Sequence, residues 1–387
     1  VYAPIDFYSF FDEDEIWDIE LLFQDSLCDA VVSAYLKDWK TDSLRTDLSV
    51  IVKNVNPYLL HWTGEWGNCN LSSYLKIAGN GNNLTRWNGE ILIDELRLKR
   101  DSLELNMGKS VLYQSPILHG NKFLQISAPF LQGNLTGNYD IPLIYDEFRA
   151  SFYKVFPSLK PKDFLMDSFD NRYQMDLTLF HLEPVFNFFN KDYLLQDTLS
   201  LSASIASDSS KLSLSLSSFR MNDKQIKIPQ LYLFRQKDSL QLKGDTRYQN
   251  QDDEELSAKF AFSAISDNVS GQISLLSLAD SAMFHLPLQF DAQLARTNSG
   301  EKELFLNLDT IVCDVNHQSL SFSPSSFHWQ EDRIDIAKFS LMRGDSPLIS
   351  LSGVASNSVT DTLHLQFREM ELSTLLTLLT GGDYHLN

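Results

Sequence analysis

The feature that most constrains this chain is a period-two alternation of apolar and polar residues, which dominates residues 198–367. In the run KLSLSLSSF, for example, Leu212, Leu214 and Leu216 alternate with serines. Successive side chains of a β-strand point to opposite faces, so the pattern predicts strands with one buried face and one face in water. Short polar breaks separate the runs and are typical of hairpin connections. The sequence therefore predicts a meander of antiparallel strands.

The first half of the chain follows the same pattern with more aromatic residues. A helix is predicted in the segment IYDEFRASFYKVFPSL, where Tyr145, Phe148, Phe152 and Val155 recur at spacings of three and four residues until Pro157 ends it. A polar residue followed by a short apolar turn recurs in residues 54–62, 181–189 and 370–379, which is typical of a quasi-repetitive, stacked architecture. Strands are expected near residues 16–24, 27–37, 44–55, 70–79, 89–98, 103–106, 109–115, 123–128 and 131–139.

Composition indicates a folded protein with a strongly acidic surface. Hydrophobic residues make up 43% and charged residues 21% of the chain, which is ordinary for a globular protein. The 387 residues include 51 acidic and 32 basic side chains, for a net charge of −19. Such a surface repels phosphates, so we expect no nucleic-acid partner and no docking on an anionic membrane surface. We expect the chain to be a piece of a longer protein, with any signal or membrane anchor outside it.

No pattern in the sequence indicates catalysis or metal binding. The three cysteines, Cys28, Cys69 and Cys313, are far apart, and the eight histidines adjoin no second ligand at metal-binding spacing. The motifs of nucleophilic serines, zinc proteases and phosphate-binding loops are missing. Acidic runs at residues 12–15 and 252–255 lack the ligand spacing of calcium loops. We therefore predict a protein that is not an enzyme and needs no cofactor or metal.

The apolar side of the predicted strands requires either a cover or a ligand. The pattern leaves open two packed sheets, or one long curled sheet whose inner face is an apolar groove. A groove of this kind would hold acyl chains, since each buried CH₂ gains about 0.8 kcal/mol. The predicted groove-lining residues are the apolar members of the alternating runs: Leu199, Leu201, Leu212, Leu214, Leu216, Leu240, Leu242, Phe260, Phe262, Leu304, Leu306, Leu308, Ile334, Ile336, Leu363, Leu365 and Phe367.

Several phrases occur in order over most of residues 65–387, and they include KFLQISAPFLQGNLTGNYD, the helix that ends in a Phe-Pro pair, and LISLSGVASNSVTDTLHLQFREMELSTLLTLL. Together these phrases resemble TamB-like translocation and assembly module proteins of the AsmA-like, bridge-type superfamily, in the variety found in Bacteroidetes-type bacteria. The residues that fill the family's positions are Ile126, Ser127, Phe130, Leu131, Gly133, Leu135, Gly137, Tyr139, Phe156, Pro157, Gly353, Leu372 and Ser373.

The resemblance implies an all-β fold with few short helices, in which an elongated, curled antiparallel sheet with quasi-repeats forms a β-taco groove. It implies a periplasmic protein, anchored in the inner membrane through a segment outside this chain, that carries phospholipids toward the outer membrane and supports outer-membrane biogenesis. A BamA-like outer-membrane barrel is the implied partner, reached through regions that this chain lacks. Accordingly, we divide the chain into a β-groove segment over residues 1–160, ending in a short helix, and continuing groove repeats over residues 161–387.

Two other hypotheses remain open. One is a scaffold or chaperone that pairs exposed strand edges with nascent outer-membrane proteins by β-augmentation. The other is a secreted β-sandwich adhesin, for which Trp62, Trp66 and Trp87 form the only local cluster that could serve as an exposed aromatic platform.

Overall fold

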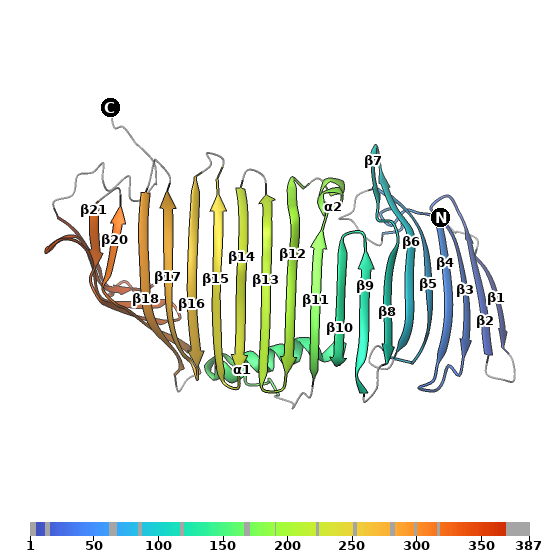
Figure 1. The fold of residues 1–387 in the computed structure, drawn as a ribbon, viewed down its shortest axis with the longest axis horizontal. Helices are drawn as coiled ribbons and strands as arrows, with labels where there is room; N and C mark the ends of the chain where they lie inside the picture. The colour runs from blue at the N-terminus through green and yellow to red at the C-terminus, as the bar shows by residue number, and fades with distance from the viewer. Residues whose placement is uncertain are drawn as a thin grey trace. The chain divides into compact units, whose positions relative to one another are not determined.

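The computed structural model of the chain is almost entirely β-structure, with 70% strand and 8% helix. The 25 strands among the residues that the structure describes form one long antiparallel sheet, which confirms the predicted all-β class (Figure 1). The structure describes residues 5–11, 16–61, 68–83, 87–116, 120–165, 171–189, 191–221, 224–250, 254–278, 283–297, 300–315 and 318–368. The predicted turn at residues 370–379 lies outside the described residues, as do Trp62 and Trp66.

The chain divides into two compact units that interleave in sequence. The first comprises Val1–Tyr145, Phe169–Ser207 and Ser217–Asn222, and the second comprises Asp146–Ser168, Asp208–Leu216 and Asp223–Asn387. The boundary that we placed at residue 160 stays a prediction.

In the first unit, strands that are consecutive in sequence pair with one another. One branch interrupts the order, because β6 pairs with β8 through residues 89–93 and with β7 through residues 97–100. The strands are β1 Ile5–Phe11, β2 Ile16–Gln24, β3 Cys28–Lys37, β4 Arg45–Val55, β5 Asn70–Asn80, β6 Asn88–Arg100, β7 Leu103–Asn106, β8 Ser110–Pro116, β9 Lys122–Ala128, β10 Leu131–Asn138, β11 Arg172–Phe180 and β12 Tyr193–Ala206.

In the second unit, the meander branches once at β18. This strand pairs with β19 through residues 290–296 and with β20 through residues 284–285, and both branches meet again at β23. The strands are β14 Lys224–Gln236, β15 Ser239–Gln249, β16 Glu255–Ile265, β17 Asn268–Leu278, β18 Met283–Arg296, β19 Lys302–Leu308, β20 Ile311–Val315, β21 Gln318–Phe322, β22 Ser325–Gln330, β23 Arg333–Arg343, β24 Ser346–Ala355 and β25 Leu363–Phe367. Strand β13, Ser209–Met221, has residues in both units.

The described helices are short. Helix α1 spans Ile144–Val155, within the segment where the sequence predicts a helix, and α2 spans Glu183–Phe188 with Pro184 in its first turn. Two 3-10 turns, η2 at Ile141–Leu143 and η3 at Pro157–Leu159, flank α1. In the first unit, Phe188 of α2 packs into a buried cluster with Leu98, Leu105 and Phe130. This contact covers the apolar residues near one end of β5–β7.

Tyr139 is a buried residue with an unmet polar group. Its side chain is 2% exposed, and its hydroxyl has no hydrogen-bond partner among the described atoms. The Lys122 ammonium lies 4.6 Å from the ring centroid. Burial raises the pKa of Tyr139 to about 12. The ring therefore contributes packing, whereas the hydroxyl carries the cost of desolvation.

We expect Tyr139→Phe to leave the free energy of unfolding unchanged or to raise it by about 1 kcal/mol, because it removes an unsatisfied hydroxyl. The wild type should lose stability as the pH rises from 10.0 through about 12, since ionisation is unfavourable only in the folded state. Urea unfolding at a series of pH values tests both points. A clear loss of stability in Tyr139→Phe at neutral pH would mean that the hydroxyl does have a partner.

Candidate functional site: the apolar face of the sheet

The strand register of the second unit brings the predicted residues of β15–β19 to one face. Directly opposed residues of antiparallel strands lie on the same side of a sheet. One row runs from Leu242 to Phe262, Gly271, Phe290 and Leu308, each opposite the next on the neighbouring strand. The row is apolar across all five strands.

A parallel row extends this face to β25. Leu306 of β19 is opposite Phe327, and Phe327 is opposite Ile336. Ile336 in turn is opposite Gly353, which is opposite Leu363. By these pairings and by alternation along each strand, the residues on this face include Leu240, Leu242, Phe260, Phe262, Leu304, Leu306, Leu308, Ile334, Ile336, Leu363, Leu365 and Phe367. We call this set and its apolar neighbours in the second unit the apolar face.

Strand β13 joins the apolar face through a side-chain contact. The Arg235 guanidinium donates to Ser210 Oγ at 3.4 Å from Nε and 3.3 Å from Nη2, and Arg235 is opposite Leu240. Ser210 is therefore on the same side, and alternation puts Leu212, Leu214 and Leu216 there as well.

The two remaining predicted residues belong to the first unit. Leu199 and Leu201 of β12 are opposite Leu179 and Leu177 of β11. That unit has an apolar face of its own, which our list of candidates largely missed although the same alternation marks it. Its further members include Val32, Val50, Leu75, Ile93, Leu112, Ile126 and Leu135.

The side chains of the apolar face are packed against one another, and in the described part of the chain no second sheet lies on them. Every described strand belongs to the same sheet, and most of the predicted residues are half-buried. The Phe260 and Phe262 rings stack at 5.3 Å between centroids, and Phe262 lies 5.7 Å from Phe290. Both Phe262 and Phe290 lean over Gly271, where a Cβ would lie 2.4 Å from Phe262 Cδ1. The glycine makes room for the two rings to meet.

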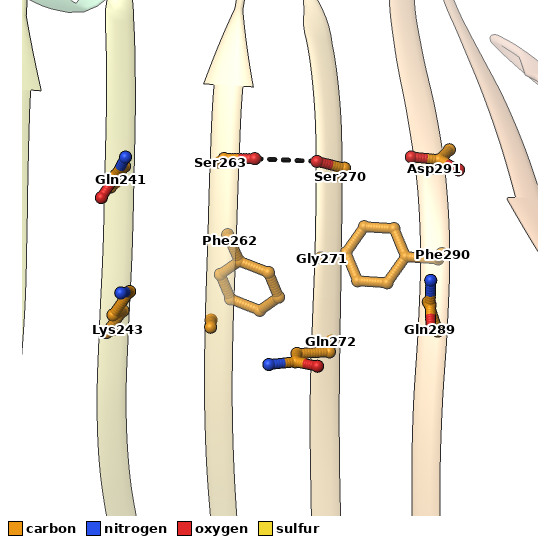
Figure 2. Close-up of a pocket in the computed structure, with 11 residues that line it drawn as sticks. Gln241, Lys243, Phe262, Ser263, Ser270, Gly271, Gln272, Gln289, Phe290 and Asp291 are labelled. Atoms are coloured by element: carbon orange, nitrogen blue, oxygen red, sulfur yellow. Dashed lines mark hydrogen bonds between the residues drawn. The ribbon is translucent and has the colours of Figure 1, made fainter.

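The opposite face of the same strands is polar. Figure 2 shows a hollow of about 350 Å³ that is lined by polar side chains of this face, from Gln241, Lys243, Gln272, Gln289 and Asp291, and also by Phe262, Gly271 and Phe290 of the apolar row. The Ser263 and Ser270 hydroxyls lie 2.7 Å apart beside them. Because Ser263 directly follows Phe262, its side chain points away from the apolar face. The sheet is therefore amphipathic, with apolar side chains on one face and polar side chains on the other.

The end of α1 covers one edge of the apolar face. Val155 and Phe156 form a buried cluster with Ala264, against which Leu240 and Val269 also pack. Polar contacts hold the segment in place. The backbone N–H of Ser158 donates to Asp267 Oδ1 at 3.0 Å, its hydroxyl donates to Oδ2 at 2.8 Å, and Arg296 Nη2 donates to the Lys160 carbonyl at 2.7 Å.

A buried arginine interrupts the apolar face near this edge. Arg235 is 4% exposed, and Glu147 of α1 is 6% exposed. Desolvation lowers the pKa of Arg235, while the charges of Asp208, Glu147 and Asp238 oppose that shift. The carboxylates thus offset the cost of burying the guanidinium, so the helix and the sheet are joined by charge as well as by apolar contact.

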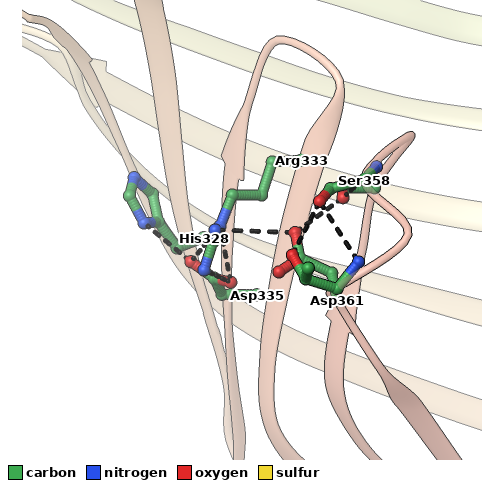
Figure 3. A network of polar contacts seen from close by, with 7 residues as sticks. His328, Arg333, Asp335, Ser358 and Asp361 are labelled. Atoms are coloured by element: carbon green, nitrogen blue, oxygen red, sulfur yellow. Dashed lines mark hydrogen bonds and ion pairs between the residues drawn. The ribbon is translucent and has the colours of Figure 1, made fainter.

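A second polar network joins the β22–β23 hairpin to the loop before β25 (Figure 3). Arg333 Nη2 contacts Asp335 Oδ1 at 3.0 Å, and Arg333 Nη1 contacts Asp361 Oδ2 at 3.6 Å. The hydrogen bond and charge of Asp335 raise the pKa of Arg333. His328 Nδ1 lies 3.8 Å from Asp335 Oδ2. The network ties β23 to the loop before β25, which is a structural role.

Metal-binding groups and disulfides are not found in the part of the chain that the structure describes. It holds no group of three or more histidine, cysteine or acidic side chains placed to bind a metal ion. Cys28, Cys69 and Cys313 are free thiols, and burial raises the pKa of each. No described helix combines the length and the apolar character needed to span a bilayer.

Fold and face together define a single-sheet, all-β protein with a partly exposed apolar side. Comparison with protein-family models, with curated proteins and with solved structures gives no match for this chain. The apolar face is therefore the feature of this chain from which a function can be proposed.

Proposed function

We propose that this chain is a non-enzymatic lipid-carrying segment whose apolar face holds the acyl chains of phospholipids. The observation that supports this proposal most strongly is the register, which aligns apolar residues from strand to strand across β15–β19 and on to β25. A series of half-buried leucines and phenylalanines offers a methylene chain contacts that water cannot match, at about 0.8 kcal/mol for each CH₂ removed from water.

We place this activity in the periplasm, in a bridge between the inner and outer membranes that supports outer-membrane biogenesis. The support is the resemblance to TamB-like proteins, whose positions Gly133, Gly137 and Gly353 fall on β-strands here. On this proposal, a BamA-like barrel meets parts of the protein outside this chain, and the inner-membrane anchor also lies outside it.

The edge strand β1 favours a second candidate function, a scaffold for outer-membrane protein strands. All seven residues of β1 are exposed, including Phe7 and Phe10, and β2 is its only partner among the described strands. An incoming strand could hydrogen-bond to its free edge by β-augmentation. Binding of a peptide in place of lipid would favour this scaffold.

A pair of neighbouring substitutions tests the lipid proposal. Leu306 lies on the apolar face, and the exposed Asn307 lies on the other. We expect Leu306→Asn to weaken binding of a fluorescent long-chain phospholipid by about tenfold, because the acyl chain loses an apolar contact. Asn307→Leu should leave the affinity unchanged. Equal affinities for both variants, with circular dichroism showing that both remain folded, would contradict the assignment of the face.

A further inference from the structure

Helix α1 carries a stripe of aromatic side chains that becomes steadily more buried along its length. Phe148 is 55% exposed, Phe152 is 37% exposed, and Phe156, just after the helix, is 8% exposed. The three follow one another at four-residue spacing, which puts the helical members on one side of the helix. Phe152 and Phe156 are in contact, with ring centroids 4.8 Å apart. The sequence predicted a helix here, and the structure leaves the side chain of Phe148 mostly exposed on it.

The stripe is continuous with the apolar face. Phe156, its buried end, belongs to the cluster that packs on Leu240, Val269 and Leu294 at the ends of the strands. The backbone N–H of Asp267 donates to the Val155 carbonyl at 3.0 Å, which fixes this junction. The apolar contacts therefore lead from Phe152 through Phe156 to the sheet, and Phe148 lies one turn before Phe152 on the same side of the helix.

A second apolar residue projects close to the helix. Leu165 is 83% exposed. Its neighbour Phe164 packs edge-to-face on Tyr153 at 5.0 Å and lies under the Arg149 guanidinium at 4.7 Å. These contacts hold the segment after η3 against α1, so Leu165 adds to the exposed apolar surface.

The charge around this stripe differs from that of the whole chain. Residues 146–165 contain four basic and three acidic side chains, whereas the chain has a net charge of −19. Of the acidic three, Glu147 is buried and Asp146 lies 3.6 Å from Arg149, so Asp163 is the one left exposed without a described ion pair. Apart from Arg149, which lies beside Asp146, the basic residues around the stripe are Lys154, Lys160 and Lys162, together with Arg296 and Lys302, which are opposite each other on β18 and β19 beside Lys160. Asp267, which accepts hydrogen bonds from Ser158, adds one negative charge there.

We propose that α1 and residues 160–165 dock on the surface of a bilayer that contains anionic lipid. Exposed aromatic and leucine side chains flanked by lysine and arginine are the composition of interfacial helices, which insert the apolar residues among the headgroups and pair the basic ones with lipid phosphates. This inference rests on the proposed function and adds a place where lipid tails reach the apolar face. The overall acidity of the chain, which argues against anionic membranes, does not describe this patch.

Vesicle flotation of the whole chain tests the proposal. We expect the wild type to float with vesicles of phosphatidylethanolamine and phosphatidylglycerol and to bind vesicles of phosphatidylcholine far more weakly. Phe148→Ser with Phe152→Ser should weaken binding to the anionic vesicles by about tenfold or more. Lys154→Glu with Lys162→Glu should do the same. The matched control, Tyr232→Ser with Val359→Ser, also removes two exposed apolar side chains of the second unit and should bind as the wild type does.

Docking is ruled out if the wild type does not float with the anionic vesicles, or if the aromatic variant binds within twofold of the wild type. Equal binding to both kinds of vesicle would overturn the role of the basic residues. Affinity for the fluorescent phospholipid in solution separates the two proposals. If the wild type binds the fluorescent phospholipid but does not float with vesicles, only the docking proposal is contradicted. If it floats but does not bind the fluorescent phospholipid, the lipid-carrying face is contradicted.

Discussion

Replacing Arg235 by alanine is expected to destabilise the second unit by about 3–5 kcal/mol, because it takes the favourable charge of the guanidinium away from the buried carboxylate of Glu147. Arg235 is 4% exposed and donates to Ser210 Oγ and, at 3.0 Å, to the Lys237 carbonyl. The charge of Glu147, a buried residue of α1, acts on Arg235. Hydrogen exchange of peptides from the second unit, followed by mass spectrometry, measures the loss where it occurs.

A double variant shows whether the charge pair is the cause. Arg235→Met with Glu147→Gln removes both charges and keeps most of the side-chain volume, so it should recover most of the lost stability. If the double variant is as unstable as Arg235→Ala, burial of Glu147 without a partner is not the source of the effect. The helix would then be held mainly by the apolar cluster around Val155 and by Asp267.

Gly137→Ala is the second substitution with a large expected effect, at least about 3 kcal/mol in the first unit. Gly137 has φ +139, a conformation that residues with a Cβ rarely adopt. A Cβ there would lie 2.1 Å from the Arg172 carbonyl oxygen and 2.7 Å from Tyr173 Cα. Both atoms belong to the backbone of β11, so no side-chain rotation relieves the overlap.

Gly120→Ala is the matched control. Gly120 also has a positive φ, +80, but a Cβ there would meet no atom within 4 Å. Its replacement should cost only the backbone preference, about 1–2 kcal/mol. Chemical denaturation gives the free energy of unfolding of both variants, and hydrogen exchange in β10 and β11 shows whether the loss occurs there. Similar losses for both variants would mean that β10 and β11 can move apart without penalty.

Much of the fold follows from alternation. The expected strands at residues 16–24 and 103–106 coincide with β2 and β7, and the others predicted in the first half end within a few residues of the observed bounds. Alternation with a period of two residues specifies which side chains share a face of the sheet. A shift of the strand register by one residue would move the leucines to the solvent-exposed face, so the register is strongly determined. The segment predicted to be helical contains α1, because its apolar residues recur every three to four positions, which is the period of an α-helix.

Other features depend on contacts between distant residues and leave no local pattern. The branches at β6 and β18 depend on where a partner strand ends, which periodicity does not encode. Arg235 and Glu147 are distant in sequence, and neither stands out among the charged residues. The spacing of Phe148 and Phe152 predicted a helix but did not show that this side of it stays exposed.

Photo-crosslinking to phospholipid tests the central claim most directly. A diazirine amino acid is placed at Leu306 on the apolar face or at Asn307 on the polar one, and the protein is irradiated with vesicle-derived phospholipid. Adducts on the acyl chain are expected from position 306, and from Leu214 as a second position on the same face, with none from position 307. Adducts from position 307 alone, or from neither face, would contradict the proposal that this sheet carries lipid.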